Sequence, residues 1–172
     1  MYTSLKLGFM LELSKYSSVK RGREVFVSFF GHRDFINNLN KEEVVKFVHE
    51  KVKGELVRFL LGNYGNFDTF AYQCAKAYKQ KYGNAKLIFV TPYLDAKYLN
   101  HCEVELFDEV VYPPLENVPL KCAILKRNEW MVAKSDFLIF YVNVGFGGAY
   151  QALEQAKRSG KERINLGALG QL

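Results

Sequence analysis

Residues 119–154, PLKCAILKRNEWMVAKSDFLIFYVNVGFGGAYQALE, form the stretch that decides the fold. Four apolar residues after Pro119 recur at the spacing of one helical face: Leu120, Ala123, Ile124 and Met131. The apolar run 137–142 suits a strand that is covered on both faces. A glycine-rich turn at 145–148 follows it, and helical spacing resumes at Ala149. The stretch therefore predicts a helix, a buried strand, a glycine turn and a second helix.

Two polar residues, Arg127 and Asn128, fall on the apolar face of the first of these helices. A guanidinium there is costly unless it is paired or faces a polar cleft. One interpretation is a core ion pair with Asp136 or Asp68, and the other is a bound anion. A glycine turn before a helix exposes backbone N–H groups that bind phosphate. We predict a nucleotide-type ligand between Arg127 and the turn at 147–148.

The rest of the chain alternates strands and helices. Strands are expected at 25–30, 55–61 and 86–91, with short ones at 109–112 and 163–166; helices are expected at 41–53 and 67–82, and residues 93–118 read as irregular. This alternation predicts an α/β, Rossmann-like three-layer fold with a mostly parallel sheet flanked by helices. We assign 1–24 to an N-terminal extension, 25–166 to the domain and 167–172 to a tail.

Three predicted strands end in polar loops that contain glycine. In parallel sheets such loops meet in a crevice at the carboxyl ends of the strands. The ordinary alternative is local structure, since Asn66 could cap the following helix and Asp68 suits its first turn. The expected nucleotide-binding residues are Gly31, His32, Arg33, Gly62, Asn63, Gly65, Asn66, Asp68, Arg127, Asn128, Gly147 and Gly148.

Composition narrows the functional classes. The chain has 172 residues and a formal charge of +6, which favours anionic partners without choosing among them. Its three cysteines lack metal-site spacing, and no nucleophile or cofactor motif stands out, so we expect no metal, no cofactor and no disulfide framework. No run is long enough for a membrane helix. We expect a cytoplasmic protein that does not bind membranes, and a homo-oligomer remains open.

Together these motifs resemble the SLOG superfamily. The resemblance rests on Phe29-Phe30-Gly31-His32-Arg33, the loop from Gly62-Asn63 to Phe67-Asp68, Val90-Thr91-Pro92-Tyr93, Arg127-Asn128 with Trp130-Met131, Ser135-Asp136, and Gly147-Gly148-Ala149. The resemblance covers about residues 25–166. Within the superfamily, the chain is most similar in its motifs to the small stand-alone proteins of bacteria and their phages. SLOG domains are Rossmann-like and related to LOG phosphoribohydrolases and to the DNA-processing protein DprA.

The resemblance implies a protein that senses or sequesters a nucleotide-derived molecule, NAD-derived or cyclic species among them, in phage defence or counter-defence. LOG enzymes carry an Arg-Lys pair and the motif Pro-Gly-Gly-x-Gly-Thr-x-x-Glu. Arg127, Gly147, Gly148 and Glu154 match that pattern, whereas Asn128, Phe146, Tyr150 and Gln151 depart from it. We therefore expect a binding protein rather than an enzyme. The alternatives are an N-glycosidase acting on nucleoside monophosphates, with Glu154 as its catalytic group, and DprA-like binding of single-stranded DNA, ranked below a small molecule.

Overall fold

The computed structural model describes residues 22–169. The strands are β1 (Glu24–Gly31), β2 (Leu56–Leu61), β3 (Ala85–Val90), β4 (Glu109–Val111), β5 (Phe137–Tyr141) and β6 (Glu162–Asn165). The helices are α2 (Lys41–Val52), α3 (Asn66–Tyr82), α4 (Ala96–His101), α5 (Ala123–Lys134), α6 (Gly148–Arg158) and α7 (Leu166–Leu169), with 3₁₀ turns at Val104–Leu106 and Leu120–Cys122. None of the helices in this part of the chain is long and apolar enough to span a membrane.

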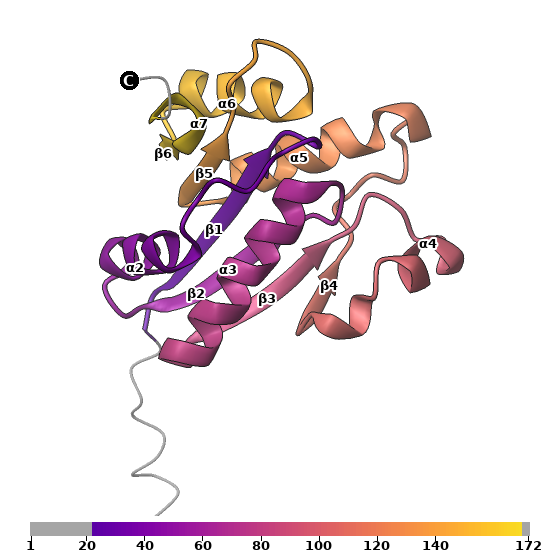
Figure 1. The fold of residues 1–172 in the computed structure, drawn as a ribbon. Helices are drawn as coiled ribbons and strands as arrows, with labels where there is room; N and C mark the ends of the chain where they lie inside the picture. Colours follow the sequence, from indigo (N-terminus) through magenta and orange to yellow (C-terminus); the bar gives the residue numbers. More distant parts are fainter. Residues whose placement is uncertain (1–21, 170–172) are drawn as a thin grey trace, which may run out of the picture.

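The six strands form one parallel sheet in the order β4-β3-β2-β1-β5-β6 (Figure 1). Val27 of the central strand β1 is in register with Phe59 of β2 on one side and with Phe137 of β5 on the other. The chain passes outward from β1 to β4 and then returns to β5 on the far side of β1. The strands remain parallel, but the order in which the chain adds them reverses between β1 and β5. Open α/β sheets bind ligands at such a position, which we call the sheet reversal.

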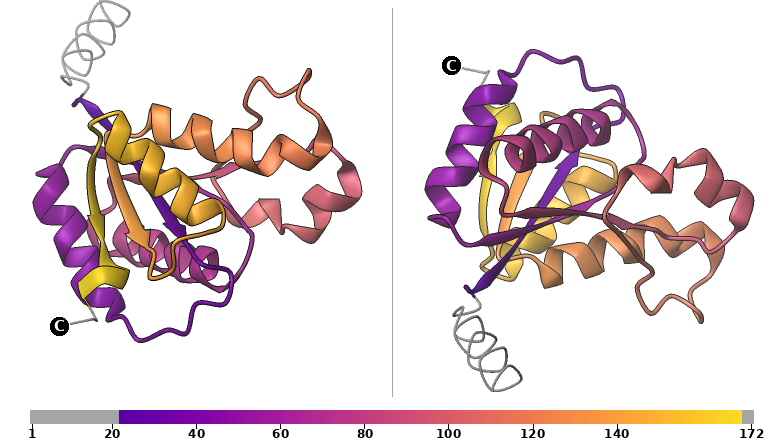
Figure 2. Two further views of the ribbon diagram at one scale, coloured as in Figure 1. Left: turned by 90° about the horizontal axis from the view of Figure 1, so that it is seen from above. Right: turned by 90° about the horizontal axis from the view of Figure 1, so that it is seen from below.

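Helices cover both faces of the sheet, as the two views of Figure 2 show, with α2 and α3 on one face and α5 and α6 on the other. The side chains of β5 alternate accordingly, because successive residues of a strand point to opposite faces. Phe137 and Ile139 pack with α2 and α3, whereas Leu138 and Phe140 pack with α5 and α6. The predicted α/β, Rossmann-like three-layer class is confirmed.

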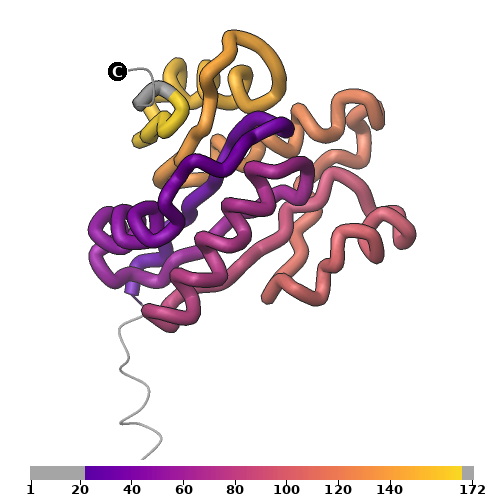
Figure 3. The backbone as a smooth tube through the Cα atoms, in the orientation of Figure 1, coloured from indigo at the N-terminus to yellow at the C-terminus, as the bar shows by residue number. Residues whose placement is uncertain are grey.

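Most expected elements lie within two residues of their predicted positions, but two expectations were wrong. The helix expected from Pro119 begins at Ala123, after a 3₁₀ turn, and Leu120 is 76% exposed instead of facing the core. The stretch expected to be irregular contains α4, which Asp95 caps by accepting a hydrogen bond from the N–H of Tyr98. Figure 3 traces this stretch as a lobe on the side of the domain away from α2 and β6.

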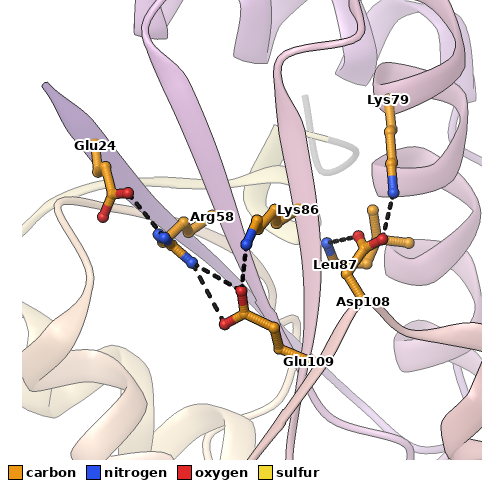
Figure 4. A network of polar contacts seen from close by, with 7 residues as sticks. All are labelled: Glu24, Arg58, Lys79, Lys86, Leu87, Asp108 and Glu109. Carbon is orange, nitrogen blue, oxygen red and sulfur yellow. Dashed lines mark hydrogen bonds and ion pairs between the residues drawn. The ribbon is translucent and has the colours of Figure 1, made fainter. Parts of the chain in front are cut away.

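A row of charged side chains crosses one end of the sheet (Figure 4). Arg58 of β2 pairs with Glu24 of β1 at 2.8 Å and with Glu109 of β4 at 3.3 Å, and Lys86 of β3 pairs with Glu109 at 2.5 Å. The row therefore connects four strands. Beside it, Asp108 accepts a hydrogen bond from the N–H of Leu87 and pairs with Lys79 of α3, which ties a helix to the same edge.

The division into extension, domain and tail stays a prediction. Residues 1–21 of the expected extension and residues 170–172 of the expected tail lie outside the described residues. The start of the tail is part of the domain packing, because Gly167 is buried and a Cβ there would meet the backbone of Val142 at 2.8 Å.

Candidate ligand-binding site

A cavity of about 820 Å³ opens at the sheet reversal between β1 and β5. Its walls come from the loops after β1 and β5, which lie at the same edge of the sheet in Figure 1, and from the starts of α3 and α6 and the face of α5. Nine of the twelve expected residues line it: Gly31, His32, Arg33, Gly62, Asp68, Arg127, Asn128, Gly147 and Gly148. Their role in binding stays a prediction.

Arg127 of α5 is 5% exposed and lies in the cavity wall beside Asp68 of α3. Its Nε donates to Asn128 Oδ1 at 3.0 Å and its Nη1 donates to the carbonyl of Val90 at 3.3 Å. Asp136, the other carboxylate considered as its partner, instead accepts from the N–H of Phe26 and pairs with Arg23. The sequence therefore placed Arg127 correctly on a buried face, and the structure selects Asp68 as the neighbouring charge.

Burial affects both charged groups. Removal from water raises the pKa of Asp68, while the positive charge of Arg127 and the hydrogen bond from the Tyr64 N–H oppose that rise. Burial likewise lowers the pKa of Arg127, and Asp68 opposes the change. Each charge thus stabilises the other.

The glycine turn before α6 also lines the cavity. Gly147 precedes α6 with φ of 89°, a left-handed conformation that favours glycine, and no side chain caps the helix there. The first N–H groups of a helix have no intrahelical acceptor and form a binding site for anions. Asn128 connects this turn to Arg127, because its Nδ2 lies 3.5 Å from a Cβ built on Gly148.

The loop after β1 lines the cavity as well. His32 Nε2 accepts a hydrogen bond from the N–H of Asn143 at 3.2 Å, which joins this loop to the loop after β5. Burial lowers the pKa of His32, against the opposing effect of Asp34, so the neutral ring that can accept this bond is favoured. Arg33 is exposed, and its guanidinium lies 4.5 Å from the ring centre of Tyr64.

Three expected residues do not line the cavity, and each holds a loop instead. The Asn63 side chain donates to the carbonyl of Cys102, and the Asn66 side chain donates to the carbonyl of Phe35. Gly65 packs against Arg33, whose Cα would lie 2.8 Å from an added Cβ. Asn66 does not cap α3, because Gly65 occupies the cap position.

Gly31 lines the cavity, yet its lack of a side chain has a packing reason. A Cβ at this position would lie 2.2 Å from the ring of Phe67.

Glu154, the weak candidate for catalysis, lies elsewhere. It borders a separate groove between α5 and α6 and pairs with Lys157 at 2.7 Å. It is not among the residues that line the cavity at the sheet reversal.

The structure adds residues that the sequence did not single out. Four exposed apolar side chains stand around the cavity: Ile36, Tyr64, Val144 and Phe146, the last of them 73% exposed. In the sequence, Phe146 is distinguished only as a departure from the LOG motif. A signal was present, because apolar residues beside glycines in polar loops have no core to enter and therefore stay accessible to a ligand.

No protein-family model and no curated protein matches the sequence. The structure is similar to DNA processing protein A from Helicobacter pylori, described as having a unique single-stranded DNA binding mode, with a TM-score of 0.57 and 18% identity. That match covers 81% of this chain and 63% of the other, so the chain spans less than two thirds of that protein. It is also similar to TM1055, a LOG-family protein, with a TM-score of 0.50 and 13% identity over 81% of this chain and 72% of that one. The fold of this chain is therefore the Rossmann-like α/β fold that these two proteins share.

Proposed function

We propose that this protein binds a nucleotide or a nucleotide-derived small molecule in the cavity at the sheet reversal. The observation that carries the proposal is the meeting of a buried guanidinium, Arg127, and the uncapped N-terminus of α6 in one cavity wall. The volume of about 820 Å³ falls in the range of small-molecule sites. The phosphate would lie at Gly147 and Gly148, within the field of Arg127 and near the Asn128 amide.

A base or a second nucleotide unit would extend toward the mouth, where Tyr64 and Phe146 offer aromatic surface. Such a protein would act either by sequestering the ligand or by reporting it to a partner. Phage defence or counter-defence is the context that the SLOG resemblance suggests, and a homo-oligomer is compatible with either mode of action. We propose no catalytic role for Glu154, because its carboxylate pairs with Lys157 outside this cavity.

The test compares phosphorylated probes with their dephosphorylated parents. AMP, GMP, ADP-ribose and cyclic dinucleotides are each added beside the matching nucleoside, and the melting temperature is measured. A ligand at 100 times its dissociation constant stabilises by about 2.7 kcal/mol, which raises the melting temperature of a domain of this size by several degrees. We expect at least one nucleotide to produce this shift and its nucleoside to produce much less. Equal shifts would remove the phosphate from the proposal.

Arg127→Gln is expected to abolish the phosphate-dependent shift. The variant also loses two hydrogen bonds and the charge beside Asp68, so its own melting temperature should fall. Arg158→Gln is the matched control, because Arg158 is exposed and borders the other groove. A nucleotide shift that survives in Arg127→Gln would assign this arginine to the core alone.

Binding of single-stranded DNA is the second candidate. It is favoured by the similarity to the Helicobacter pylori protein, by the charge of +6 and by the exposed aromatic residues at the mouth of the cavity.

A further inference from the structure

Asp68 and Arg127 are held at a spacing that a direct ion pair does not use. A Cβ built on Gly62 would lie 2.6 Å from Asp68 Oδ2 and 2.9 Å from Arg127 Nη1, so these two atoms are at most 5.5 Å apart. No ion pair within 4.0 Å joins the two side chains. A gap between 4.0 and 5.5 Å fits one oxygen atom at hydrogen-bond distance from both groups, since each such bond spans about 2.7–3.0 Å.

Both side chains keep hydrogen-bonding capacity at this gap. Asp68 Oδ2 accepts from the Tyr64 N–H at 2.7 Å, and Oδ1 makes no hydrogen bond to any residue that the structure describes. Arg127 uses Nε and Nη1, and within residues 22–169 its Nη2 has no acceptor. A carboxylate offers about four acceptor sites and a guanidinium five donors, so both are incompletely satisfied.

The chemistry of the gap selects a neutral hydroxyl group. A hydroxyl donates one hydrogen bond and accepts others, so it can donate to Asp68 and accept from Arg127 at the same time. An ionised phosphate oxygen has no proton to donate, and its charge would be repelled by the carboxylate at this distance.

We propose that Asp68 and Arg127 together bind the 2′-hydroxyl of the ligand's ribose, so that the site takes ribonucleotides in preference to 2′-deoxyribonucleotides. This inference rests on the proposed function. The polar groups are successive neighbours in the cavity wall: Asp68 neighbours Arg127, Arg127 bonds to Asn128, and Asn128 adjoins Gly148. The sugar lies at the Asp68 end of this series and the phosphate at the Gly148 end.

The experiment measures dissociation constants of wild-type protein by calorimetry for two matched pairs of probes. The pairs are ribose 5-phosphate with 2-deoxyribose 5-phosphate, and the best-binding nucleoside monophosphate with its 2′-deoxy form. We expect the ribose member to bind about 10- to 100-fold tighter, because a deoxy probe lacks the hydroxyl and leaves charged groups of the site without a partner.

Asp68→Ala is expected to bring both members of each pair to the same affinity, by weakening the ribose member and leaving the deoxy member little changed. Asp68→Asn keeps the shape of the side chain and an acceptor for the Tyr64 N–H, so it serves if the alanine variant does not fold. It should reduce the ratio several-fold. Asp34→Asn is the matched control, since Asp34 is an exposed carboxylate at the same cavity, and it should keep the wild-type ratio.

The possible outcomes separate the two proposals. Equal binding of ribose and deoxyribose probes by the wild type would overturn the role of Asp68 and leave the nucleotide site intact. A ratio that persists in both Asp68 variants would overturn it as well. Failure of every phosphorylated probe to bind would overturn the proposed function and this inference with it.

Discussion

At the scale of single residues, the site depends on side chains whose surroundings differ from those of ordinary surface groups. The sequence identified Arg127 as a candidate site residue because a buried guanidinium is costly unless it has a partner. Arg127 is indeed buried. Asp68 was ambiguous, since an acidic residue in the first turn of a helix is stabilising in any protein. Gly62 explains their arrangement, because a Cβ there would lie 2.6 Å from Asp68 Oδ2 and 2.9 Å from Arg127 Nη1.

His32 makes a pH-dependent contact between two loops. Protonation removes the acceptor that the Asn143 N–H uses. Because burial lowers the pKa of His32 in the folded protein below its ordinary value of 6.5, the unfolded chain binds the proton more readily. The contribution to stability is therefore fully present above pH 6.5 and is lost as the pH falls through the folded pKa.

We predict that the wild type loses more stability than His32→Gln between pH 7.5 and pH 5.5, because glutamine keeps an acceptor and does not titrate. Urea unfolding of both proteins at the two pH values measures this difference. His101→Gln is the control, since His101 is exposed on α4 and should leave the wild-type pH dependence unchanged. Parallel pH profiles of the wild type and His32→Gln would contradict the assignment.

At the scale of elements, the short edge strand β4 depends on charges for its attachment. It has three residues and a partly exposed burial pattern, so it buries little apolar surface. Glu109 receives hydrogen bonds from Lys86 and Arg58, and the bond from Lys86 is the largest cause of its lowered pKa. A carboxylate with a lowered folded pKa stabilises the protein above its unfolded pKa, near 4.5, and loses that effect as the pH falls.

Glu109→Gln should therefore lower the melting temperature at pH 7 by about 1–4 °C, the range expected for partly exposed ion pairs worth up to about 1 kcal/mol. The two melting temperatures should approach each other as the pH falls from 7 to 3, because protonation of the Glu109 carboxyl removes the charge that Lys86 and Arg58 pair with. Thermal unfolding at both pH values tests this. Glu116→Gln, at an exposed residue outside the row, should show no pH-dependent difference. A difference that is as large at pH 3 as at pH 7 would indicate a packing effect.

At the scale of the whole molecule, the charge of +6 would act differently on the two candidate ligands. A single phosphate inside a cavity is poorly screened by salt, whereas a DNA strand releases one counterion for nearly every phosphate that it contacts. Salt dependence therefore distinguishes a buried nucleotide site from a DNA groove.

We predict that the nucleotide affinity changes only modestly between 50 and 200 mM salt, while the affinity for an oligothymidylate is weaker and falls steeply over the same range. Fluorescence titration measures both affinities. In 200 mM salt, the oligonucleotide should not displace the nucleotide. Tight oligonucleotide binding at that concentration, unaffected by nucleotides, would favour the DNA-binding candidate instead.

The local sequence determined the fold class and most of its elements. A buried strand such as 137–141 is apolar along its length, and a helix between sheet and solvent repeats its apolar residues every three to four positions. The same rule explains the failures. Helix α4 has no buried residue, so its sequence carries no apolar periodicity. Leu120 matched the helical period of α5, but it lies in the 3₁₀ turn that precedes this helix. Burial leaves a trace along the chain only where an element has a buried face.

The sequence also placed nine of the twelve expected residues at one cavity, because the carboxyl ends of parallel strands lie at a common edge. Only the tertiary structure separated Asn63, Gly65 and Asn66, whose polar groups or lack of a side chain hold loops, from the residues that line the wall. It alone decided that Arg127 lies beside Asp68 and that Glu154 lies outside the cavity. Periodicity along the chain reports which way a side chain points, but the distance between two side chains on different helices depends on how those helices pack against the sheet.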